Sequence, residues 1–219
     1  LWLQQFMGYT STQAGELMAP VGLFAIILSP LVGKNVSKVD PRGLTSFAFL
    51  VFALVLWMRS NFNTQADEAT ILVPTIIQGV AVAFFFVPLS TIAFATIEPV
   101  YRADATSLFS LVRNIGSSIG ISMVTLMLTR NVQINHSELG ASISMFNPTL
   151  TAMFQGPSRN LVTLQQLEGM VTQQALMISY LDDFKLMMII TICAMPLAWF
   201  LRKPTPRVLP PGQAPIAHD

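Results

Sequence analysis

The stretch that decides the fold is DATSLFSLVRNIGSSIGISMVTLMLT, residues Asp104 to Thr129. After its first residue it carries a single charge, Arg113, and at about 1.5 Å per helical residue it can cross a hydrocarbon core about 30 Å thick. Arg113 then lies near mid-membrane, where an arginine costs at least about 2.5 kcal/mol. Intramembrane charges therefore face a bundle interior or a wet cavity, which favours transport. An arginine that snorkels to the headgroups or braces two helices is the alternative.

The composition indicates an integral membrane protein. Hydrophobic residues make up 53% of the 219 positions and charged residues 11%, well below the roughly 25% charged residues of soluble domains. The net charge is +1, and no basic patch interleaved with aromatic residues suggests a nucleic-acid partner. Cys193 is alone inside an apolar stretch, which predicts neither an intrachain disulfide nor a cluster of metal ligands.

Five apolar stretches are long enough to span a membrane. They are residues 14–33, 43–59, 71–97, 105–129 and 184–201. The third stretch is longer than a span needs and contains Pro88, whose ring removes a helix hydrogen bond and crowds the carbonyl of Phe84. A tilted or kinked helix is expected there. The sequence thus predicts an all-α, polytopic helical bundle.

Lysine and arginine residues are distributed unevenly between the two sides of this bundle. One side, made of the loops after the first and third spans and of the C-terminal segment, holds most of them: Lys34, Lys38, Arg42, Arg102, Arg202, Lys203 and Arg207. The positive-inside rule places this side, with the C-terminus, in the cytoplasm. Leu1 then lies outside, and no initiator Met or signal peptide precedes it. We therefore expect a C-terminal part of a longer protein.

Residues 130–183 form an external segment that is too long to be a plain connector. Within it, residues 158–180 carry apolar side chains at helical spacing, and Ser158 is available as an N-cap. We interpret this part as an amphipathic helix that either lies on the outer surface or runs into the last span. Its role is also open: it either binds a partner or is a solvated helix with one packed face. Residues 203–219 are rich in proline, and we expect a disordered cytoplasmic tail.

The fourth span carries a polar stripe. Four of its residues share one helical face: Ser110, Arg113, Ser117 and Gly120. Asn114 lies about 100° round from Arg113. Gly116 and Gly120 form a GxxxG step, which allows two helix backbones to approach closely in lipid. We expect this stripe to lie inside a bundle, with the span at 14–33 as the neighbour of the two glycines.

Two further groups are candidates for function. In the third span, Gln78 is a buried polar candidate, and Phe85 with Pro88 could form an aromatic wall for an apolar ligand; contact with lipid or another helix is the ordinary explanation for such phenylalanines. Asp40 and Arg42 follow the first span and form either a cytoplasmic ion-pair latch between neighbouring helices or an ordinary basic loop. No glycine-rich phosphate loop or HExxH motif is present, so we expect no enzyme.

The order of several short motifs resembles the EmrB/QacA-type drug:proton antiporters, fourteen-span members of the major facilitator superfamily. The motifs are Gly8-Tyr9-Thr10-Ser11-Thr12, Ala19-Pro20-Val21-Gly22, Ile77-Gln78-Gly79, Phe85-Phe86-Val87-Pro88-Leu89, Gly116-Ser117-Ser118-Ile119-Gly120 and Phe146-Asn147-Pro148. The resemblance covers residues 1–202 and is strongest to EmrB-like exporters of the bacterial inner membrane. By this likeness, the five spans correspond to spans ten to fourteen.

The resemblance implies alternating access between two helical halves, with efflux of amphipathic drugs driven by inward proton flow. The proton gradient then takes the place of a cofactor. The implied partners are drug-like molecules, protons, membrane lipid, a periplasmic adaptor protein and an outer-membrane channel. The family's proton-handling residues belong to an absent N-terminal half, so the fragment alone should not transport.

We therefore expect the C-terminal part of a multidrug exporter, with Arg113 in a gating or charge-balancing role, Asn114 supporting it, and Gln78 and Phe85 with Pro88 at the cavity. A major facilitator carrier for a metabolite such as a siderophore or amino acid is one alternative. A membrane scaffold or assembly protein that acts through the external segment is the other. An apolar cavity with few fixed charges favours drugs, whereas a second buried charge placed to pair a substrate carboxylate favours a metabolite.

Overall fold

The computed structural model describes residues 3–4, 8–36, 38–62, 68–94, 97–142 and 161–200, and every regular element within them is helical. In chain order they are α2 (Ser11–Asn35), α3 (Pro41–Ser60), α4 (Glu68–Phe94), the 3-10 turn η1 (Pro99–Tyr101), α5 (Arg102–Ser142), α7 (Leu161–Ala194) and α8 (Leu197–Phe200). Five of these helices are long and apolar enough to cross a membrane. The predicted all-α, five-span membrane fold is confirmed.

Local chemistry fixes where the first two long helices begin. The Thr10 side chain accepts a hydrogen bond from the Gln13 backbone N–H, and the Gln13 side chain accepts one from the Thr10 backbone N–H, a reciprocal capping box. Asp40 caps α3 by accepting from the Arg42 backbone N–H, with Pro41 at the first helical position. Both helices therefore begin at the turn residues that precede their apolar runs.

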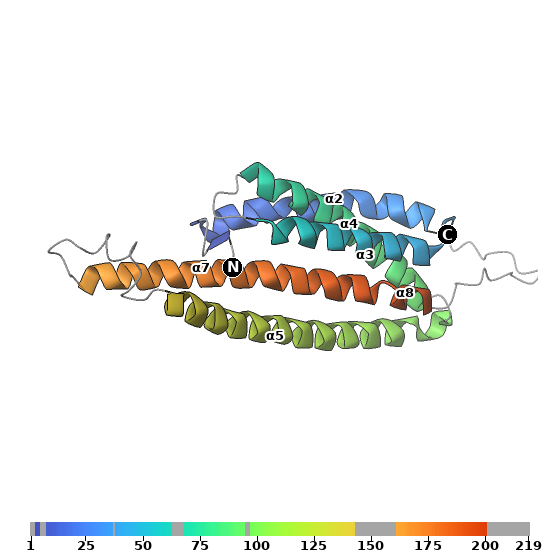
Figure 1. The fold of residues 1–219 in the computed structure, drawn as a ribbon. Coiled ribbons are helices and arrows are strands. Elements are labelled where there is room, and N and C mark those ends of the chain that lie inside the picture. The colour runs from blue at the N-terminus through green and yellow to red at the C-terminus, as the bar shows by residue number, and fades with distance from the viewer. Residues whose placement is uncertain are drawn as a thin grey trace, which may run out of the picture.

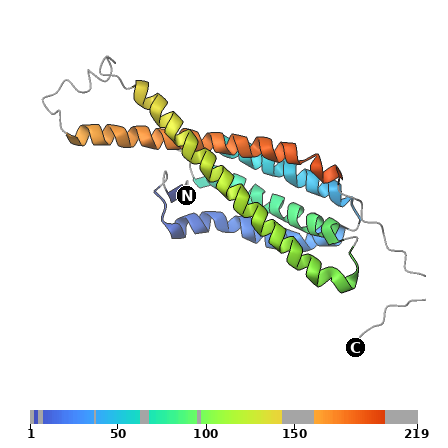
Figure 2. The same cartoon turned by 90° about the horizontal axis from the view of Figure 1, so that it is seen from below.

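The helices form two groups that meet along α3 and α7. Figure 1 shows α2, α3 and α4 running side by side, with α7 and α5 along one flank. Helix α4 contacts both α2 and α3, α7 contacts both α3 and α5, and α5 has its main helix contact with α7. Figure 2 shows the first half of α5 leaving α7 at an angle. No described side chain of α5 is fully buried, so α5 is the peripheral helix of this part of the protein.

Helices α2 and α4 approach each other closely, and Gly79 makes this approach possible. A Cβ atom placed on Gly79 would lie 2.8 Å from the Val21 carbonyl oxygen and 2.9 Å from the Phe24 Cβ atom. Real Cβ atoms do not approach that closely, so the contact requires a glycine. This is the role of small residues in membrane helix packing, and it places α4 firmly against α2.

Helices α3 and α4 are joined by phenylalanine rings. Phe47 meets Phe84 edge to face with ring centroids 5.4 Å apart, and Phe85 meets both Phe49 and Phe52 at 5.3 and 5.9 Å. Edge-to-face pairs stabilise by about 0.5 to 1.5 kcal/mol beyond the area they bury. The phenylalanines of the third span therefore form a contact between α3 and α4, as expected if they do not line a ligand cavity.

The last two long helices extend far beyond the predicted spans. Helix α5 has 41 residues and continues to Ser142, beyond residue 129, where the predicted span ends. Helix α7 has 34 residues without a break, so the amphipathic segment runs into the last span and is not a separate surface helix. At about 1.5 Å per residue they measure about 60 and about 50 Å, well beyond a core of about 30 Å. Residues 143–160 and the predicted tail at 203–219 lie outside the described residues.

Candidate functional site

Arg113 lies on the part of α5 that no other helix covers. Every residue from 111 to 120 is exposed, and the Arg113 guanidinium has no hydrogen-bond or ion-pair partner among the described residues. Asn114 is exposed beside it, and its carbonyl accepts a hydrogen bond of 3.0 Å from the Ser117 hydroxyl. The sequence-predicted stripe is thus displayed intact on one helix, but this part of the protein provides no neighbour for it.

The two glycines of the GxxxG step are equally uncovered. A Cβ atom placed on Gly116 or on Gly120 meets nothing within 4 Å. The expected contact between these glycines and the first span, now α2, is therefore wrong in this structure. The glycine that lets α2 approach another helix is Gly79 of α4 instead. A packing role for Gly116 and Gly120 against another part of the protein stays a prediction.

Asp40 and Arg42, the residues of the predicted latch, lie at the start of α3. Asp40 accepts a hydrogen bond of 3.3 Å from the backbone N–H of Arg42, as the cap of α3. The ion pair that joins described residues is Lys185 with Asp182 on α7, at 3.2 Å. The Arg42 Nε atom is buried without a hydrogen-bond partner. Asp40 therefore serves helix initiation, and a latch between neighbouring helices stays a prediction.

Gln78 is bound to a residue that sequence reasoning passed over. Arg59, in the last turn of α3, donates a hydrogen bond of 2.6 Å from Nη2 to the Gln78 Oε1 atom of α4. Both side chains are half-buried. A guanidinium has five N–H donors and no acceptor, so the neutral amide of Gln78 satisfies only part of its capacity. Arg59 is thus a half-buried charge between α3 and α4, whereas Arg113 is exposed on α5.

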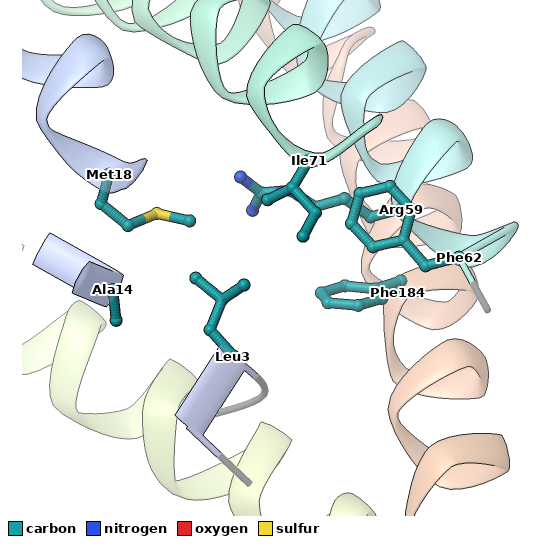
Figure 3. A pocket seen from close by; sticks show the side chains of 7 residues that line it. All are labelled: Leu3, Ala14, Met18, Arg59, Phe62, Ile71 and Phe184. Atoms are coloured by element: carbon teal, nitrogen blue, oxygen red, sulfur yellow. The ribbon is translucent and has the colours of Figure 1, made fainter. Parts of the chain in front are cut away.

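Arg59 forms part of the wall of a cavity of about 180 Å³ that lies between α2, α3, α4 and α7 (Figure 3). The lining side chains are Leu3, Ala14, Met18, Arg59, Phe62, Ile71 and Phe184. All of these except Arg59 are apolar. Ala14 and Met18 belong to the first two turns of α2, and Ile71 to the first turn of α4. The cavity therefore lies near the end of the bundle where α2 and α4 begin and α3 ends.

The electrostatics of this cavity are set by Arg59, the charged residue of its lining. The Arg59 guanidinium has no carboxylate within 4.0 Å among the described residues. Removing an ion from water without pairing it costs several kcal/mol, and buried charges are therefore normally paired. The arrangement can hold an anion, because the remaining N–H groups of a guanidinium suit carboxylate or phosphate oxygens.

Residues 1–134 match the model of the family described as Major Facilitator Superfamily. The chain belongs to this superfamily. It is 37% identical over 207 residues to Multidrug export protein EmrB of Escherichia coli K12 and 34% identical to Probable multidrug resistance protein EmrY of the same strain; each alignment covers 92% of this chain and 40% of the relative. It is 32% identical over 208 residues to Fatty acid resistance protein FarB of Neisseria gonorrhoeae, covering 93% of this chain and 41% of that protein. The chain spans about two fifths of the length of these relatives.

The remaining predicted residues of this facilitator chain lie away from the cavity. Phe85 packs on α3, and Pro88 is buried within α4. The hydroxyls of Ser90 and Thr91 donate to the Val87 carbonyl at 2.9 and 2.8 Å, in the turn that follows Pro88. Neither Phe85 nor Pro88 lines the cavity of Figure 3. Their part in a substrate cavity stays a prediction.

A second polar contact of the facilitator chain was also missed by sequence reasoning. The Asn135 side chain of α5 donates a hydrogen bond of 2.9 Å to the Ser179 hydroxyl of α7. One helical turn further along α7, Asp183 is buried, and one of its carboxylate oxygens has no partner. The only feature of the sequence that pointed to a polar site here was the pair Asp182 and Asp183 at the edge of the last apolar run.

Proposed function

We propose that this chain is the C-terminal part of a multidrug exporter that works by proton-coupled antiport. The observation that carries the proposal is the 37% identity to Multidrug export protein EmrB across 92% of the chain, within a superfamily match over residues 1–134. A transporter of this kind needs no enzymatic activity and no cofactor beyond the proton gradient. The proposal includes a place in the bacterial inner membrane with the C-terminus in the cytoplasm, supported by the distribution of lysine and arginine.

The exposed stripe of α5 gives Arg113 its proposed role. A charge at mid-membrane is costly in contact with lipid, about 2.5 to 3.5 kcal/mol on insertion scales. Since no described helix covers residues 111–120, we assign this face to a water-filled path or to the remainder of the full-length protein. Arg113 then gates the path or balances charge during turnover, and Asn114 supports it.

Efflux from cells tests this role. In the full-length protein, Arg113→Ala should insert normally and should slow efflux of a fluorescent cation by about tenfold or more, because an interaction of a charged group is worth about 1.5 to 3 kcal/mol. Arg113→Lys should recover only part of the loss, since an ammonium lacks the planar fork of a guanidinium. Arg130→Ala, at another exposed arginine of α5, is the matched control. Efflux by Arg113→Ala at the parent rate would remove Arg113 from the mechanism.

A periplasmic adaptor protein and an outer-membrane channel belong to the same proposal. Figure 1 shows α5 and α7 projecting together past the ends of α2 and α4, and Met170 on α7 is 65% exposed. Such a protruding helix can dock an apolar face into a partner groove. Export names among the relatives favour an exporter over a scaffold protein.

A further inference from the structure

The Arg59 cavity combines one fixed positive charge with apolar walls. Figure 3 shows the terminal nitrogens of Arg59 on the side of the cavity that faces Met18, while Phe62, Phe184 and Leu3 surround the space beside them. A positive group beside an apolar surface is complementary to a molecule with the opposite arrangement, an anionic head on an apolar body.

Gln78 prepares the guanidinium for such a ligand without neutralising it. The hydrogen bond of 2.6 Å from Arg59 Nη2 to Gln78 Oε1 anchors one corner of the planar group. Since a guanidinium carries five N–H donors in a fixed fork, donors remain for a bidentate contact with two oxygens of one anion. A carboxylate at the position of Gln78 would have cancelled the charge, whereas an amide orients it and leaves the positive charge available.

The volume limits how much of a ligand the cavity holds. A cavity of about 180 Å³ is slightly larger than an engineered cavity of about 150 Å³ that binds benzene. It is smaller than the pockets of about 300 to 1,000 Å³ that enclose whole drug-sized ligands. The cavity therefore admits an anionic head with one ring or a short alkyl segment, and the rest of a longer ligand must leave through its open side.

We propose that Arg59, held by Gln78, binds the carboxylate or phosphate oxygens of an amphipathic anion whose first apolar segment packs against Phe62, Ile71 and Phe184. The bound molecule is either a free amphipathic acid or an anionic membrane lipid, which share this chemistry. Only the idea that the acid is exported cargo rests on the proposed function. The binding site itself does not.

Equilibrium binding of radiolabelled dodecanoate tests the site. The full-length protein is purified and placed in nanodiscs of zwitterionic lipid, and binding is measured with dodecanol and dodecyltrimethylammonium as uncharged and cationic competitors. Dodecanoate should bind the parent and be displaced by neither competitor at equal concentration. Arg59→Gln should weaken binding about tenfold or more, because a charge-assisted contact is lost. Arg130→Gln, at an exposed arginine of α5, is the matched control and should bind as the parent does.

A second variant keeps the test decisive if Arg59→Gln does not fold. Gln78→Glu keeps the size of the side chain and places a carboxylate against Arg59, so it should weaken dodecanoate binding by a similar factor while strengthening the α3 to α4 contact. Equal binding by the parent and both variants, equal displacement by dodecanol, or no binding to the parent would each overturn the proposal. The last result means that the cavity is closed in the full-length protein.

The two sources of anion are separated in nanodiscs that contain phosphatidylglycerol. If a lipid headgroup occupies the site, phosphatidylglycerol should weaken dodecanoate binding to the parent and leave the residual binding to Arg59→Gln unchanged. If the parent binds dodecanoate equally in both membranes, the free acid is the ligand. Failure of the export proposal is recognised separately, as absence of proton-driven cation efflux by the unmodified protein.

Discussion

Single residues set the closest contacts and the exposed charges of this molecule. Gly79 brings α2 against α4, Gln78 holds Arg59 at the cavity, and Arg113 is displayed on an uncovered helix. From the sequence, Gly79 was identified only as part of the motif Ile77-Gln78-Gly79. The helix that a single glycine contacts cannot be predicted from the sequence around it. Apolar spacing and GxxxG steps identify small residues, but the partner depends on how the helices are arranged in three dimensions.

Adding a single methyl group at Gly79 should be costly. Gly79→Ala places a Cβ atom 2.8 Å from a backbone oxygen of α2, and overpacking of this kind destabilises by about 1 to 3 kcal/mol. Gly140→Ala, where a Cβ atom meets nothing within 4 Å, is the matched control. Thermal denaturation in detergent, followed by size-exclusion chromatography, should show a lower midpoint for Gly79→Ala alone. Equal midpoints for the two variants would mean that α2 and α4 lie further apart.

At the scale of the elements, the apolar runs gave the helices but not their ends. A span is marked by hydropathy, so the five crossings could be predicted. The continuation of α5 to Ser142 lies in polar sequence, where hydropathy carries no signal, whereas the start of α7 at Leu161 lies within the helix predicted at residues 158–180. Arg59 was missed for a related reason. At the end of an apolar run an arginine is typical of an interfacial loop, and only the pairing of α3 with α4 brings it to Gln78.

The long α5 and α7 pair predicts a specific crosslink. Asn135 and Ser179 are hydrogen-bonded at 2.9 Å across the two helices, so their backbones lie close enough for a disulfide to be expected, which requires Cα atoms within about 7 Å. In a Cys193→Ser background, the variant with Asn135→Cys and Ser179→Cys should readily form a disulfide between α5 and α7. After proteolytic cleavage between the two helices, this disulfide should keep the fragments together in non-reducing gel electrophoresis. Asn135→Cys with Ile178→Cys is the control, since Ile178 is partly exposed on another face. Crosslinking of the control alone would contradict the observed register.

At the scale of the whole molecule, orientation follows from the basic residues. Val39 is exposed in the turn between α2 and α3, and Ser137 is exposed near the end of α5. If the C-terminus lies in the cytoplasm, single cysteines at these positions in a Cys193→Ser background should react with a thiol reagent from opposite sides of the membrane. Ser137→Cys should react from outside and Val39→Cys from inside. Impermeant thiol reagents applied to intact cells and to inverted vesicles measure this. Labelling of both positions from the same side would exclude the proposed topology.

Proton movement in proteoliposomes shows whether this chain is part of a proton-coupled exporter with Arg113 in its working path. The full-length protein is reconstituted with a pH-sensitive dye inside, and a fluorescent cation is added under an imposed pH gradient. Protons should leave the vesicles in step with entry of the cation, and Arg113→Ala should lose both signals together. Cation transport without proton movement, or coupled transport by Arg113→Ala at the parent rate, would contradict the proposed mechanism.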